Sequence, residues 1–175
     1  MHLLYNIAFK LKLILMNLKL ASIVVLLFIS FSSLAQSDQV APTAAKSIYF
    51  ELGGPGLASV NFDTRFGKRE DGIGGRIGIG GFSIDGEGVV FLPVAVNYLL
   101  GKDSRNYFEL GAGVTPVLGS GDAGDNFSAT FGHVLFGYRM QPRNGGFLFR
   151  AFISPVFGDW GFFPYYGGVA FGYKF

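Results

Sequence analysis

The chain has 175 residues, half of them hydrophobic, with 20 Phe, 27 Gly and no Cys. The lack of Cys excludes disulfides, thiolate metal sites and attachment as a lipoprotein. Its formal net charge of +2 depends on residues 1–35, which hold three of the fourteen basic residues and none of the twelve acidic ones. Without them the chain carries eleven basic and twelve acidic side chains, so its charge gives no reason to expect a nucleic-acid partner.

Residues 1–35 have the organisation of a cleavable signal peptide. Three lysines precede an apolar run over residues 20–31, and Ser33-Leu34-Ala35 then supplies small residues for a signal peptidase. The run is shorter than the ~20 residues that a spanning helix needs, although an uncleaved inner-membrane anchor is an alternative. We expect cleavage after Ala35 and export of the remainder, with either Met1 or Met16 as the start residue.

Residues 36–46 form a polar leader that we expect to lie in the periplasm without fixed structure. Beyond it, glycines alternate with aromatic residues, and no apolar stretch sustains a period of 3.6 residues. Residues 47–175 therefore form a single all-β domain. Gly-rich or charged turns separate eight candidate strands, at 47–53, 57–66, 73–82, 89–100, 106–118, 127–141, 146–157 and 163–175.

The strands alternate apolar and polar residues with a period of two, as at Val60 and Phe62 against Asn61 and Asp63. Apolar side chains that face lipid and polar side chains that face a lumen are typical of bacterial outer-membrane barrels, and eight is their smallest usual strand number. We predict an eight-stranded antiparallel up-and-down transmembrane β-barrel in the outer membrane of a Gram-negative cell. The C-terminal assembly signal consists of Phe171, Tyr173 and Phe175.

Two candidate strands depart from this pattern. The strand over residues 89–100 is apolar on both faces and contains Pro93, which removes a hydrogen-bond donor from the ladder. The strand over residues 127–141 changes its apolar phase between Phe131 and Phe136, which a β-bulge near Gly132 would explain.

Charged residues recur at inward-facing positions of the strands. A charge inside a barrel surrounded by hydrocarbon is costly unless it is paired, so we expect an ionic network that fills the lumen and fixes the register. The alternative is a narrow, slightly positive passage. The expected lumen residues are Glu51, Asp63, Arg65, Arg76, Glu109, His133, Arg139, Arg150 and Lys174.

Each candidate catalytic or cofactor motif lacks a residue or a structural context that its chemistry requires. His133 is the single histidine after residue 35, and Leu135 stands where the outer-membrane lipid A deacylases carry a catalytic Ser. The G-x-G-x-x-G match over residues 119–124 opens a strand rather than a helix, so we interpret it as a loop. We therefore predict that the protein is not an enzyme and needs no cofactor. Asp122 and Asp125 could touch a calcium ion but lack the ligand spacing of a known loop.

Five aromatic residues cluster near the last loop. They are best explained as part of an interfacial girdle, since such rings prefer the headgroup level, and a ligand-binding aromatic patch is the alternative. The cluster consists of Trp160, Phe162, Phe163, Tyr165 and Tyr166.

Several segments together resemble a family of small exported outer-membrane barrels that carry no assigned activity. They are residues 97–102, 109–113, 137–142 and 145–150, with the terminal Gly172-Tyr173-Lys174-Phe175. The resemblance spans nearly the whole exported chain and implies the same fold and location. It transfers no catalytic residue. Ala170 stands where the assembly signal of such barrels usually has Gly.

The leading hypothesis is a monomeric barrel with a structural or membrane-integrity role. Its partners would be outer-membrane lipid, lipopolysaccharide and, during biogenesis, the barrel-insertion machinery. A minor pore or carrier for small solutes is the second hypothesis. A soluble periplasmic barrel that binds lipid is the third, and it requires an apolar interior and a polar exterior.

Overall fold

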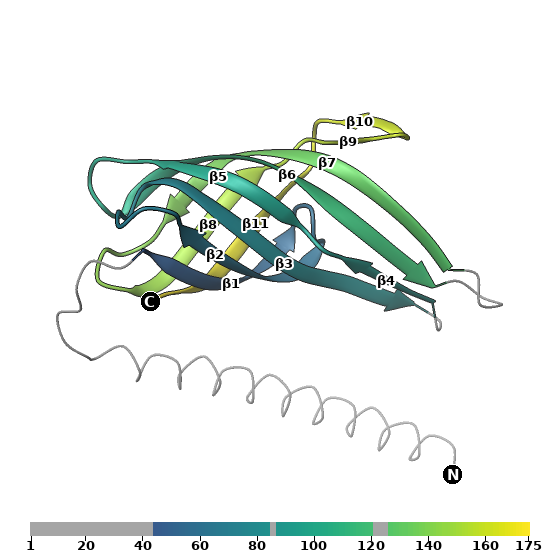
Figure 1. Ribbon diagram of the computed structural model, residues 1–175, viewed down its shortest axis with the longest axis horizontal. Helices are drawn as coiled ribbons and strands as arrows, with labels where there is room; N and C mark the ends of the chain where they lie inside the picture. Colours follow the sequence, from purple (N-terminus) through teal and green to yellow (C-terminus); the bar gives the residue numbers. More distant parts are fainter. Residues whose placement is uncertain (1–43, 85–86, 121–125) are drawn as a thin grey trace, which may run out of the picture. The chain divides into compact units, whose positions relative to one another are not determined.

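The computed structural model describes residues 44–84, 87–120 and 126–175, which are all strand, turn or irregular chain (Figure 1). The predicted signal peptide and most of the predicted leader lie outside these residues. The strands are β1 (Lys46–Gly53), β2 (Ala58–Arg65), β3 (Gly72–Ile84), β4 (Glu87–Phe91), β5 (Val94–Leu100), β6 (Asn106–Ser120), β7 (Asn126–Met140), β8 (Gly146–Ile153), β9 (Val156–Gly158), β10 (Gly161–Phe163) and β11 (Gly167–Lys174). No helix in the described part of the chain is long and apolar enough to cross a membrane.

The strands close into an antiparallel barrel. β1 pairs with β2, and β2 pairs with β3. β3 then pairs with both β4 and β5, and both of these strands pair with β6. The ring continues through β7, then β8, and returns through β11 to β1. Because β4 and β5 share one position and β9 extends β8, the barrel has eight strand positions. The predicted fold is confirmed.

Side chains alternate between an apolar exterior and a polar interior. In β2 the exposed Val60 and Phe62 alternate with the buried Asn61, Asp63 and Arg65. The exterior carries many exposed large apolar side chains, whereas the interior buries eight Asp, Glu, Lys and Arg side chains of the strands. This arrangement is the opposite of what a soluble lipid-binding barrel requires.

Two neighbouring prolines interrupt the hydrogen-bond ladder of the unusual strand at residues 89–100. They are Pro93 in this strand and Pro116 in β6. The ladder is interrupted at Leu92 and Pro93, yet the registers on both sides match, since Phe91 pairs with Val117 and Val94 with Val114. The carbonyl of Pro93 still accepts a hydrogen bond from Gly78 at 2.8 Å, and Leu92 donates to Pro116 at 3.0 Å. The two prolines therefore remove donors without shifting the register.

The predicted β-bulge near Gly132 is wrong. The register of β7 against β6 runs without a shift from Asn126 to Met140, and that against β8 and β9 is equally continuous. The apolar phase changes because Phe131 shares the interior phase of His133 and lines an aromatic pocket. An apolar residue is tolerated inside the barrel there because its neighbours are aromatic too.

A bulge does occur near the last hairpin. Ser154 donates its backbone N–H to the carbonyl of Tyr166 at 2.7 Å, whereas Val156 pairs with Phe163. The single residue Pro155 thus faces both Pro164 and Tyr165, and two residues against one define a bulge. The predicted strand at 163–175 accordingly splits into β10 and β11.

Both ends of the barrel chain meet at one end of the barrel. Lys46 exchanges backbone hydrogen bonds with Phe175, at 2.9 and 3.4 Å. β1 therefore begins within the predicted leader, because Lys46 belongs to the strand. The turns at residues 66–71, 101–105 and 141–145 lie at this end, and the β9–β10 hairpin lies at the opposite one.

Candidate functional site

The barrel interior is filled by an ionic cluster, which we call the interior cluster. Its side chains come from β1, β2, β3, β5, β6, β7 and β8, and each is at most 4 % exposed. Alternation places them all on the inner face, so closing the barrel brings them together. The interior cluster consists of Glu51, Asp63, Arg65, Arg76, Asn97, Glu109, Arg139 and Arg150.

Arg150 is the centre of one half of the cluster. It donates from Nη1 to Glu51 Oε2 at 2.8 Å and from Nε to Glu109 Oε2 at 2.8 Å. Its guanidinium carbon lies 4.6 Å from the ring centroid of Tyr49 and 5.0 Å from that of Phe152. Two carboxylates and two aromatic rings therefore hold one cation, an arrangement that compensates much of its desolvation.

Asp63 is the centre of the other half. It accepts hydrogen bonds from Arg65 at 2.6 Å, from Arg139 at 3.1 Å and from Asn97 at 2.6 Å. Asp63 lies on β2 and Arg139 on β7, and three strand positions separate these strands in either direction around the barrel. The pair thus spans the full width of the lumen.

The two halves are joined through Asn97 and through Arg139, whose Nη1 lies 3.9 Å from Glu109 Oε1, whereas Arg76 belongs to the half around Arg150. Asn97 donates from Nδ2 to both Asp63 and Glu109, the latter at 2.9 Å, and Arg76 donates to Glu51 at 3.0 Å. Asn97 is not among the lumen residues expected from the sequence, although its position in the alternation of residues 94–100 marks it as inward-facing. An uncharged amide in the sequence does not indicate ion pairing, yet the Asn97 amide bridges the carboxylates of Asp63 and Glu109.

The structure leaves two of the expected lumen residues outside the interior cluster. Lys174 is buried at the end that carries the termini, where it pairs with Glu70 and donates to the carbonyl of Pro142 at 3.2 Å. His133 is fully buried, and its Nδ1 lies 3.4 Å from the hydroxyl oxygen of Thr115. These two residues are inward-facing but have separate partners.

Two residues of the predicted assembly signal, Phe171 and Tyr173, lie on the exterior face of β11, and Phe175 directly follows this strand. Phe171 packs against Phe149 with ring centroids 5.4 Å apart and against Phe147 at 6.4 Å. Phe175 remains 60 % exposed. The terminal segment thus adds to an aromatic stripe that runs across neighbouring strands.

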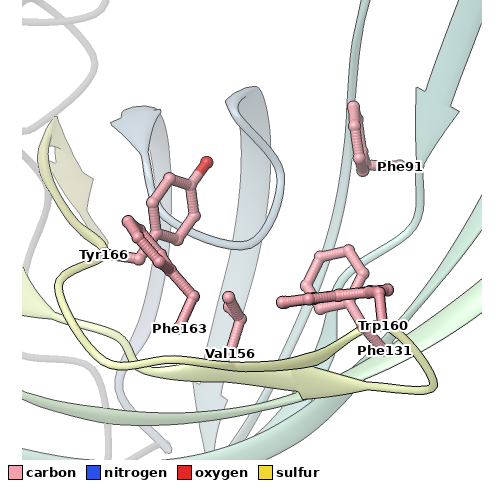
Figure 2. Close-up of a pocket in the computed structure, with 6 residues that line it drawn as sticks. All are labelled: Phe91, Phe131, Val156, Trp160, Phe163 and Tyr166. Carbon is pink, nitrogen blue, oxygen red and sulfur yellow. The ribbon is translucent and has the colours of Figure 1, made fainter.

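A second feature is an aromatic pocket at the end of the barrel opposite the termini (Figure 2). It has a volume of about 370 Å³ and contains no charged side chain. Three of the five aromatic residues near the last loop contribute to it, whereas Phe162 and Tyr165 are exposed outside it. We call it the aromatic pocket, and it is lined by Phe91, Phe131, Val156, Trp160, Phe163 and Tyr166.

Neither feature is a metal centre. Within the described ranges no group of three or more His, Asp or Glu side chains could hold a metal ion. The expected calcium contacts Asp122 and Asp125 lie outside those ranges.

The fold and the charged interior define a small closed barrel of the outer-membrane type. Among solved structures the chain is similar to the N-terminal β-barrel domain of Pseudomonas aeruginosa OprF, with a TM-score of 0.56 at 12% sequence identity. That match covers 78% of this chain and 100% of the OprF domain. The similarity shows the fold, and it confirms the architecture that the sequence resemblance implied.

A second structure has a weaker similarity. Ail, the attachment invasion locus protein of Yersinia pestis, gives a TM-score of 0.46 at 16% identity, over 75% of this chain and 96% of Ail. No protein-family model and no curated protein sequence matches the chain.

Proposed function

We propose that this protein is an integral outer-membrane barrel that stabilises the membrane and does not conduct. The observation that carries the proposal is the interior cluster, whose Asp63–Arg139 pair crosses the lumen. The apolar exterior supports membrane insertion, because a band of exposed Val, Ile, Leu and Phe side chains suits hydrocarbon and not water. An export signal at residues 1–35 would deliver the chain to that membrane.

The closed interior argues against the pore hypothesis. A conducting path would have to pass Arg150, which is held by Glu51 and Glu109 with three hydrogen bonds of 2.8 to 3.0 Å. Opening it would leave buried charges without partners, which costs several kcal/mol. The structural role therefore has more support than transport of small solutes.

Biogenesis requires a partner that inserts the barrel, and the exposed terminal Phe175 is the proposed contact. Phe175→Ser should lower the amount of folded protein in the outer membrane. Phe66→Ser is the matched control, because Phe66 is 63 % exposed and lies at the same end of the barrel. Equal loss in both variants would contradict a specific role for the C-terminus.

Fractionation tests the proposal directly. Protein from a purified outer-membrane fraction, run on a gel in detergent without boiling, should migrate faster than the boiled sample, because a closed barrel resists unfolding by detergent. A single band found in the soluble periplasmic fraction would contradict membrane insertion.

A further inference from the structure

The aromatic pocket is built from side chains that share the interior phase of their strands. Every second residue of a strand faces the interior, so residues an even number of positions apart share a face. By this count Phe91 faces the same side as the buried Asn97, and Phe131 the same side as His133. Val156 likewise faces the same side as Arg150. The hollow therefore lies inside the mouth of the barrel, separated from surrounding lipid by the strands themselves. Trp160, Phe163 and Tyr166 complete it from the hairpin side (Figure 2).

The pocket is closed toward the middle of the barrel. His133, the register partner of Val156, is fully buried beside Thr115, so solvent does not reach the interior below the pocket. Beyond these residues lies the interior cluster, and Phe152 covers its Arg150, with the ring centroid 5.0 Å from the guanidinium carbon. These buried residues would block a molecule that enters the mouth. The pocket can therefore bind a ligand but does not lead into a channel through the barrel.

The local backbone positions the indole ring. A Cβ atom added at Gly158 would lie 2.8 Å from Nε1 of Trp160, so a larger residue there would displace the indole ring from its position against the strand. The bulge at Pro164 and Tyr165 shifts the strand phase, so that Phe163, the register partner of Val156, faces the same hollow as Tyr166. The glycine and the bulge of this hairpin thus both position aromatic side chains in the pocket.

The lining determines the chemistry of the occupant. A charged ligand would lose its hydration without gaining a partner, because no lining side chain is charged. Five aromatic rings offer faces and edges for offset and edge-to-face contacts with a flat ring. A volume of about 370 Å³ is near the lower end of the usual range for small-molecule sites.

We propose that the aromatic pocket binds an uncharged, flat aromatic molecule that arrives from the aqueous phase. A lipid chain is disfavoured because the lining faces the barrel interior and not the bilayer. The inference goes beyond the proposed structural role. It depends only on the fold of the mouth and would survive if the protein proved not to stabilise the membrane.

Trp160 is the single tryptophan of the chain, so its fluorescence reports on the pocket alone. The probe is 1-acetonaphthone, a flat uncharged ketone, titrated into the purified protein in phospholipid nanodiscs. The quenching of Trp160 fluorescence should saturate. Phe131→Ala should raise the half-saturating concentration about tenfold, which corresponds to about 1.4 kcal/mol of lost contact.

The matched control is Phe162→Ala, because Phe162 belongs to the same hairpin, is 65 % exposed and does not line the pocket. It should leave the half-saturating concentration unchanged. Phe91→Ala, on a different strand, should act like Phe131→Ala and replaces that variant if it fails to give the fast-migrating unboiled band.

Two results would overturn the proposal. Quenching that rises linearly with ketone, equally in parent and variants, would mean collision without a site. Strong quenching of Trp160 in nanodiscs made with brominated acyl chains, unrelieved by the ketone, would instead identify a lipid chain as the occupant.

Discussion

The interior cluster and the aromatic pocket occupy the same barrel but are held together differently. In the cluster Arg150 is fully buried and makes directed hydrogen bonds to two carboxylates. In the pocket Trp160 is 61 % and Phe163 47 % exposed, and the contacts are non-directional. The middle of the barrel is therefore specified by charge pairing, whereas its mouth retains open apolar surface that a ligand can cover.

The largest effect is expected where two buried carboxylates would lose their shared partner. Arg150→Ala should lower the free energy of unfolding by about 3–5 kcal/mol, because Glu51 and Glu109 would each keep a buried charge with fewer donors. Urea unfolding in lipid vesicles measures it. Arg69→Ala is the control, since Arg69 forms a salt bridge with Asp71 but its side chain is 78 % exposed. A loss as small as that of the control would contradict the account.

The pair across the lumen should be coupled. A double-mutant cycle of Asp63→Asn and Arg139→Gln should give an interaction energy of about 1–3 kcal/mol, because the two side chains share a hydrogen bond of 3.1 Å. The same unfolding assay supplies the four free energies. Additive effects of the two changes would mean that the contact contributes nothing specific.

Changes at the mouth should be mild by comparison. Trp160→Ala and Phe163→Ala should each change the free energy of unfolding by about 1 kcal/mol or less, because each side chain buries only about half of its surface. Thermal unfolding followed by circular dichroism would show it. A loss as large as that of Arg150→Ala would remove the contrast between the two regions.

The smallest effect concerns the turn at residues 101–105, outside the strands. Hydrogen bonds from the Asn106 side chain and from the backbone N–H groups of Asn106 and Arg105 lower the pKa of Asp103 from 3.8 to about 2. The ionised carboxylate therefore stabilises the fold above about pH 4, and this contribution is lost as the pH falls through about 2. NMR titration of the Asp103 carboxyl should give that midpoint, whereas a midpoint of about 4 would contradict the hydrogen bonding.

The sequence predicts the barrel well because alternation with a period of two is a local signal. It assigns Glu51, Asp63 and Arg150 to the interior from strand phase alone, and the structure places them there. It cannot give the partners of each charge, since Asp63 and Arg139 are 76 residues apart and meet only when the ring closes. Pairing depends on the stagger of the whole barrel.

The mouth was harder to predict for a different reason. The phase change at Phe131 favours a bulge when the sequence is considered alone, because an aromatic side chain in the interior phase contradicts the polar-lumen pattern. Its neighbours in the pocket, Phe91 and Trp160, lie on other segments of the chain and become adjacent only in the folded barrel. The sequence signal for the pocket is the cluster of aromatic residues near the last loop. That cluster does not contain Phe91 and Phe131, the two strand residues that complete the aromatic lining.

In the proposed function, the interior cluster closes the lumen of a membrane-inserted barrel. The most direct test is the ionic conductance of the folded protein in planar lipid bilayers, with Arg150→Ala measured alongside the parent. The parent protein should give no resolved current steps, even where the fast-migrating unboiled band shows a folded barrel. Regular current steps from the parent that change in Arg150→Ala would show that the lumen conducts past the cluster and would contradict it.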